Sequence, residues 1–109
     1  ALPIFVFAHG ADSHEDDEGW HFNEQGQCNT QEWTQAANIT YSFIKDMQTK
    51  YNKYIPTTLS LFGGYRSDDF ESVLNLHVKN FIQALNILCD HSIQDDLHIS
   101  KPDFTFDLI

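Results

Sequence analysis

The chain has 109 residues, enough for one domain and too few for two of ordinary size. Its 16 Asp and Glu residues against 6 Lys and Arg give a formal net charge of −10, which argues against a nucleic-acid ligand because phosphates need basic partners. With 41% apolar and 14% aromatic residues it is too hydrophobic for a disordered tail. No apolar run approaches the roughly 18 residues of a membrane-spanning helix, so we expect no membrane partner.

The N-terminal part predicts a short strand followed by a polar loop. Residues 4–8 form a continuous apolar run that ends at His9-Gly10, which is typical of a short buried strand. Residues 10–19 are polar and hold five acids and no base. Residues 20–22 indicate a short second strand, and residues 23–29 a turn.

A long amphipathic helix is predicted over residues 30–54. Asn29 is a good N-cap, and Glu32 stands three residues later, as in a capping box. Trp33 opens an apolar stripe at helical spacing, and we therefore expect it in the core. Pro56 ends the pattern.

The second half of the chain predicts a strand and a second long helix. Residues 57–62 are rich in β-forming residues and are followed by Gly63-Gly64. Asp68, or Ser67, is expected to cap the helix that follows. Its apolar stripe is wide, which indicates a helix covered on much of its circumference and leaves room for a second copy of the chain. The stripe comprises Phe70, Val73, Leu74, His77, Val78, Phe81, Ile82, Leu85, Leu88 and Cys89, and Leu76 and Ile87 lie off it.

The tail alternates apolar and polar residues at 97–99 and 104–108, which indicates one broken strand or two short ones. The order of elements predicts a single small α/β (α+β) domain spanning residues 1–109. We expect a mixed β-sheet of about three to five strands with two long amphipathic helices packed on one face.

Acidic residues are concentrated at the two ends of the chain. Residues 1–44 carry seven acids and no Lys or Arg, and residues 90–109 carry five acids and one Lys. Such segregation favours an acidic surface that binds a basic protein, as in an inhibitor or immunity-type partner of a basic toxin or enzyme. The alternative is that the charge serves solubility alone. The expected partner-binding residues are Asp12, Glu15, Asp16, Asp17, Glu18, Asp95 and Asp96, with Trp20 and Tyr65 as aromatic anchors.

Histidines near the N-terminus suggest a second hypothesis, a transition-metal site. His9, His14 and His21 stand among carboxylates, and imidazole with carboxylate suits Zn²⁺ or Cu²⁺. Their spacing fits no zinc signature, so the alternative is a solvated acidic loop with incidental histidines. We expect no other cofactor.

The two cysteines, Cys28 and Cys89, would close a loop of about 60 residues if paired. The alternative is two free thiols. The even cysteine count, the Asn38-Ile39-Thr40 sequon and the absence of an initial Met favour a secreted or periplasmic protein over a cytoplasmic one.

No catalytic constellation is evident, and we expect a binding protein rather than an enzyme. Cys89 and His91 are two residues apart and would face different sides of one helix. The Gly63-Gly64 turn lacks the Lys-Ser/Thr ending of a phosphate-binding loop. A lone His77 on an apolar stripe indicates a core residue with its hydrogen bonds satisfied.

Overall fold

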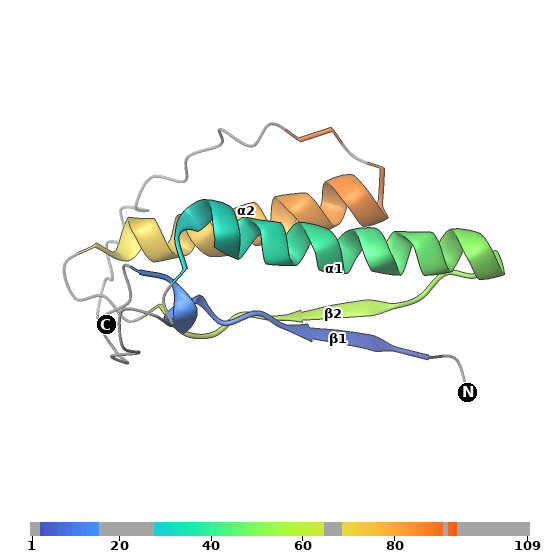
Figure 1. Ribbon diagram of the computed structural model, residues 1–109, viewed down its shortest axis with the longest axis horizontal. Helices are drawn as coiled ribbons and strands as arrows, with labels where there is room; N and C mark the ends of the chain where they lie inside the picture. The colour runs from blue at the N-terminus through green and yellow to red at the C-terminus, as the bar shows by residue number, and fades with distance from the viewer. Residues whose placement is uncertain (1–2, 16–27, 65–68, 91, 94–109) are drawn as a thin grey trace, which may run out of the picture.

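The computed structural model describes residues 3–15, 28–64, 69–90 and 92–93, and shows a two-layer α/β arrangement (Figure 1). In chain order the elements are β1 (Phe5–Ala8), the short 3₁₀ helix η1 (Ala11–Ser13), α1 (Thr30–Tyr51), β2 (Thr57–Ser60) and α2 (Phe70–Leu88). Both long helices lie on the same side of the strands and run in the same direction, opposite to them. The predicted mixed α/β class, with two helices and a sheet, is confirmed.

The described strands form a two-stranded parallel sheet rather than the larger mixed sheet that the sequence predicts. Phe5 pairs with Thr57 and Ala8 with Ser60. The other segments predicted as strands, 20–22, 97–99 and 104–108, lie outside the described residues. A sheet of three to five strands therefore stays a prediction.

Helix α1 begins as predicted and ends earlier. The Asn29 side chain accepts a hydrogen bond from the Glu32 N–H at 2.9 Å, and the Asn29 N–H donates to the Glu32 carboxylate at 2.9 Å. The helix ends at Tyr51, before the predicted residue 54, because Asn52 adopts a left-handed conformation with φ 47°. Asn tolerates this conformation better than most residues, so Asn52 and not Pro56 ends the helix.

Helix α2 is capped one residue later than predicted. The Asp69 carboxylate accepts a hydrogen bond from the Ser72 N–H at 3.0 Å, so Asp69 and neither Asp68 nor Ser67 is the N-cap. The buried face also differs from the predicted stripe: Leu76 is only 6% exposed, whereas Phe70 and Phe81 are 59% and 49% exposed. An apolar stripe wider than the contact face does not show which of its residues meets a neighbour.

The core lies between the strands and the helices. Ala37, Tyr41 and Ile44 of α1 and Ala84 of α2 form one buried cluster, and Phe7 and Leu59 pack against it from the strands. A second cluster joins Ala11, Trp33 and Leu76 near the start of both helices. Trp33 is 1% exposed, which confirms its predicted place in the core.

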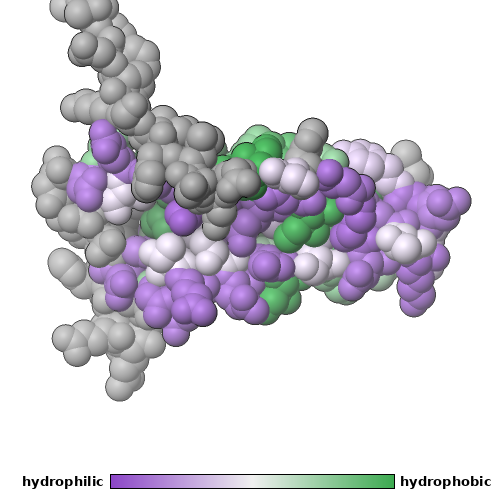
Figure 2. Space-filling view, turned by 90° about the horizontal axis from the view of Figure 1, so that it is seen from above, coloured by the Kyte–Doolittle hydropathy of each residue, from purple (hydrophilic) through white to green (hydrophobic). Residues whose placement is uncertain are grey.

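The outer side of the helix layer is mostly hydrophilic, with apolar patches between the polar side chains (Figure 2). Ile39 and Phe43 of α1 remain 61% and 56% exposed. Within the described residues, neither long helix has a stretch long and apolar enough to cross a membrane.

One polar pair sits inside the core between the helices. The Tyr41 hydroxyl donates a hydrogen bond to Oδ1 of Asn80, and both residues are fully buried. The Asn80 Nδ2 group has no hydrogen-bond partner among the described residues. The pair therefore fixes how α1 faces α2 while leaving one buried donor uncompensated.

We predict that Tyr41→Phe destabilises the protein by about 1–3 kcal/mol, because it leaves a buried amide oxygen without a donor. Replacing both partners, Tyr41→Phe with Asn80→Leu, should restore most of the loss because no polar atom of the pair remains. Chemical denaturation of the wild type and the two variants measures this. A double variant less stable than Tyr41→Phe alone would contradict the prediction.

Candidate functional site

The parallel pairing brings the residues that follow both strands to one end of the molecule (Figure 1). His9 and Gly10 follow β1, and residues 61–64 follow β2. Helices α1 and α2 both begin at this end. We call residues 9–15, 28–33, 61–64 and 69–71 the carboxyl end. Open α/β sheets bind their ligands at this edge, so it is the first place to look for a site.

Backbone hydrogen bonds hold the carboxyl end together through η1. The Ala11 N–H donates to the Phe62 carbonyl at 2.9 Å, which ties η1 to the segment after β2. The Cys28 N–H donates to the Ser13 carbonyl at 2.9 Å, and the Glu15 N–H donates to the Cys28 carbonyl at 2.8 Å. Residues 16–27 therefore leave and re-enter the described structure at adjacent positions of the carboxyl end.

Two glycines make the close approach of η1 possible. Gly63 and Gly64 have φ of 77° and 82°, a conformation that residues with a side chain rarely adopt. A Cβ at Gly63 would lie 2.6 Å from the Asp12 backbone nitrogen, and one at Gly64 would lie 2.3 Å from Cγ1 of Val73. The Gly-Gly pair is a tight turn, as expected from the sequence, and it lets two backbone segments meet.

His9 is clamped to the first turn of α1. Its ring stacks on Trp33 with centroids 4.0 Å apart, and its Nε2 lies 3.0 Å from the Trp33 carbonyl oxygen. Because a carbonyl only accepts, the neutral His9 ring carries its proton on Nε2. The Trp33 indole N–H donates in turn to the Gly10 carbonyl at 3.0 Å. These bonds fix the end of β1 against α1.

His77 reaches the same cluster from α2. Its ring meets Trp33 edge-on, with centroids 6.3 Å apart. Its Nδ1 is buried and has no hydrogen-bond partner among the described residues. The expectation of a fully satisfied core histidine is therefore wrong in this respect.

The pKa values of both imidazoles in this cluster are lowered, which favours their neutral forms. Burial lowers the pKa of His9, the bond to the Trp33 carbonyl opposes this, and the nearby His77 lowers it further. Burial also lowers the pKa of His77, against a hydrogen bond with the Gly63 backbone. Among the described residues, the two rings contact Trp33 and join the ends of β1, α1 and α2.

Charge is segregated along the length of the molecule. At the carboxyl end, every Asp, Glu, Lys or Arg among the described residues is an acid: Asp12, Glu15, Glu32, Asp69 and Glu71. The described lysines lie elsewhere, Lys79 midway along α2 and Lys45, Lys50 and Lys53 on or just after the second half of α1. Lys45 bridges to Asp90 at 3.1 Å. Among the described residues, acids therefore gather at the carboxyl end, and the predicted acidic binding surface stays a prediction.

Two of the predicted partner-binding residues, Asp12 and Glu15, lie at the carboxyl end. Glu15 is exposed and Asp12 is half-buried beside Gly63. The remaining predicted residues, Asp16, Asp17, Glu18, Trp20, Tyr65, Asp95 and Asp96, lie outside the described residues.

Sequence reasoning missed several residues of this surface. Glu32, Asp69 and Glu71 join the acidic group because both helices begin here, and acids are favoured in a first helical turn. The exposed apolar side chains of Phe62 and Phe70 lie beside them, 46% and 59% exposed. The signal was present in the sequence: strands joined by a long helix are parallel, so the acids that start both helices must share one end.

The predicted metal ligands are only partly described. His9 uses Nε2 on Trp33, and His14, which is 2% exposed, places its Nε2 2.9 Å from Oγ1 of Thr30. Within the described residues, no group of three His, Cys, Asp or Glu side chains is arranged to hold a metal ion. His21 lies outside them, so the Zn²⁺ or Cu²⁺ hypothesis gains no support.

Of the two alternatives for the cysteines, the structure shows two free thiols and no disulfide. Cys28 and Cys89 are both free thiols. Cys28 precedes α1 and Cys89 follows α2, and because the helices run in the same direction the two residues lie at opposite ends of the helix layer (Figure 1). A helix of this length separates its ends by roughly 28 Å, far beyond the reach of a disulfide.

Comparison with protein-family models, with curated proteins and with solved structures found no match for this chain. A function for this chain is therefore inferred from the chemistry of its own residues.

We predict that Gly63→Ala destabilises the protein by about 1–3 kcal/mol, because Ala must hold a left-handed φ while its Cβ meets the Asp12 backbone. Ser60→Ala, a small change on the neighbouring half-buried strand residue, is the control and should cost less than about 0.5 kcal/mol. Denaturant unfolding measures both. Equal stability of the two variants would refute the role assigned to the glycine turn.

The neutral histidines predict a loss of stability in mild acid. His9 and His77 have lower pKa values in the folded protein than the 6.5 of an unfolded chain, so the unfolded state takes up protons first as pH falls. The free energy of unfolding should therefore be highest above pH 6.5 and decrease below it. Denaturation at pH 7.5, 6.5 and 5.5 measures the slope, and His77→Gln should reduce it. An unchanged slope in that variant would contradict the assignment.

Proposed function

We propose that this protein binds a basic protein through the carboxyl end, acting as an inhibitor or immunity-type partner of a basic toxin or enzyme. The observation that carries the proposal is the segregation of charge: the described part of the carboxyl end holds only acidic charged side chains, and the described lysines lie away from it.

The segment between Glu15 and Cys28 strengthens this polarity. It carries Asp16, Asp17, Glu18 and Glu24 and no Lys or Arg. Both of its neighbours are hydrogen-bonded to each other at the carboxyl end. We expect the acids of this segment to add to the field of the described carboxylates, because the residues that flank the segment both lie at the carboxyl end. A field of one sign steers an oppositely charged protein and raises its association rate by about 10- to 1,000-fold.

Apolar contacts give such a surface its binding energy. Phe62 follows β2 and Phe70 opens α2, and both remain largely exposed among the acids. An aromatic side chain surrounded by charged groups is the usual composition of an interface, with an apolar centre and a polar rim. These two residues supplement the predicted anchors Trp20 and Tyr65.

We predict that charge reversal at the carboxyl end slows association and that reversal elsewhere does not. Affinity capture at low salt from an extract of the native host, with wild-type and variant proteins, identifies the partner, and stopped-flow mixing measures the rate. Replacing Asp16, Asp17 and Glu18 by Lys should lower the rate by about 10- to 100-fold at low salt. Glu15→Lys alone should give a smaller decrease in the same direction.

Asp46→Lys is the matched control, because Asp46 is an exposed acid on the second half of α1 and the change in net charge equals that of Glu15→Lys. If both single variants slow association equally, net charge alone is responsible and the proposed surface is wrong. If raising the salt concentration does not slow the wild type, steering by charge is also wrong.

A further inference from the structure

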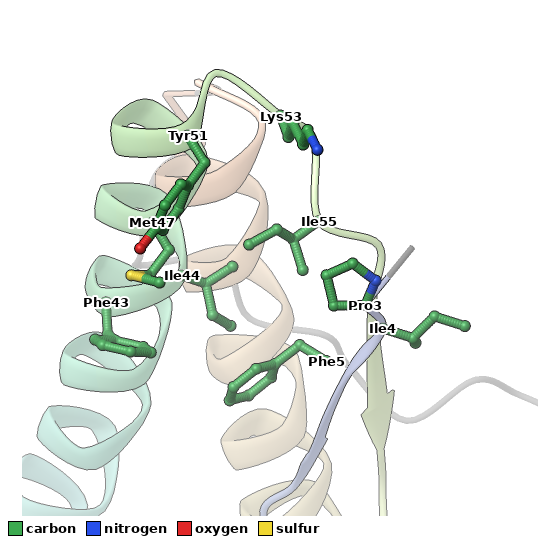
Figure 3. A pocket seen from close by; sticks show the side chains of 9 residues that line it. All are labelled: Pro3, Ile4, Phe5, Phe43, Ile44, Met47, Tyr51, Lys53 and Ile55. Atoms are coloured by element: carbon green, nitrogen blue, oxygen red, sulfur yellow. The ribbon is translucent and has the colours of Figure 1, made fainter. Parts of the chain in front are cut away.

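A second feature lies at the opposite end of the sheet, where the strands begin. A pocket of about 620 Å³ opens between the last two turns of α1 and the start of β1 (Figure 3). Ligand sites in proteins range from about 300 to 1,000 Å³, so the pocket is large enough for a small molecule. Its walls are formed mainly by Phe5, Phe43, Ile44, Met47, Tyr51 and Ile55.

The walls offer hydrocarbon and few free polar groups. The Phe5 N–H already donates to the Pro56 carbonyl at 2.9 Å, and the Ile55 N–H donates to Oε1 of Gln48 at 3.0 Å. A peptide in this pocket would bury amide groups without partners, which is unfavourable. An alkyl chain has no such groups, so the walls select hydrocarbon over peptide.

A cation stands at the rim of the pocket. Lys53 lines it, is exposed to solvent and has no carboxylate partner among the described residues. A second cation, Lys50 of the last turn of α1, lies nearby. Its Nζ is 5.3 Å from the centre of the ring of Tyr51, which lines the pocket. The chain has a net charge of −10, yet none of the residues that line this pocket is an Asp or a Glu. The rim is therefore less acidic than the rest of the chain. It complements a ligand whose polar end is an anion.

We propose that this pocket binds a single-chain fatty carboxylate. The alkyl chain lies along Phe43, Met47 and Ile55, and the carboxylate pairs with the Lys53 ammonium at the rim. The apolar walls favour the alkyl chain of the ligand, and the Lys53 ammonium favours its carboxylate. This activity is separate from the proposed binding of a basic protein, since the two sites lie at opposite ends of the sheet.

Calorimetric titration of the whole protein with octanoate, decanoate and laurate tests the chain. We expect binding of one molecule per protein, with affinity rising about fourfold for each added methylene buried in the pocket. Lauryl alcohol, which has the same chain and no charge, should bind at least about tenfold more weakly than laurate. Absence of laurate binding, or equal binding of acid and alcohol, overturns the proposal.

Substitutions in the pocket and outside it test where laurate binds. Lys53→Glu should weaken laurate at least about tenfold and Lys53→Arg should retain it, whereas Lys79→Glu on α2 makes the same charge change away from the pocket and should have no effect. Phe43→Asp should abolish binding, and Phe70→Asp at the carboxyl end is its control. Both phenylalanines are more than half exposed, so these changes leave the core intact.

Loss of binding in a control variant would overturn the placement. Flotation of the protein with phosphatidylglycerol vesicles, without any binding of laurate, would also overturn the proposal. The pocket surface would then bind a bilayer rather than a free fatty acid. Loss of laurate binding together with normal capture of a basic protein leaves the proposed function standing, and the reverse result removes only that function.

Discussion

The parallel pairing of β1 with β2 is the constraint on which the remaining structure depends. Two parallel strands cannot be joined by a tight turn, so the chain must return along the sheet through a crossover, which here includes α1. The return sets the direction of α1, and α2, which follows β2, packs on the same face and runs in the same direction (Figure 1). Everything that follows a strand, and everything that starts a helix, therefore lies at the carboxyl end.

This geometry gives the two ends of the molecule different chemistry. The carboxyl end gathers the acids of η1 and of both first helical turns, and Trp33 locks it by bonding to His9 and Gly10. The other end gathers apolar side chains from α1 and β1 around Lys53. The surface proposed for a protein partner and the pocket proposed for a fatty carboxylate therefore lie at opposite ends of the sheet.

Local signals in the sequence predicted the local structure well. The Asn29 and Glu32 capping box and the burial of Trp33 follow from spacing and residue type alone. The strand predicted over residues 57–62 is present but ends at Ser60. Tertiary contacts were beyond such reasoning. The wide stripe of α2 did not show that Phe70 points to solvent, and counting cysteines did not show that α1 and α2 hold Cys28 and Cys89 at opposite ends. That His77 Nδ1 is buried without a hydrogen-bond partner among the described residues also depends on which side chains surround it.

Mapping by nuclear magnetic resonance tests most directly whether the fold collects an acidic recognition surface at the carboxyl end. The isotopically labelled protein is titrated with a lysine-rich peptide at low salt. We expect the largest shift changes in residues 11–15, 31–34 and 69–72, and we expect added salt to remove them. Changes of equal size along the second half of α1, or changes that persist in high salt, would contradict it.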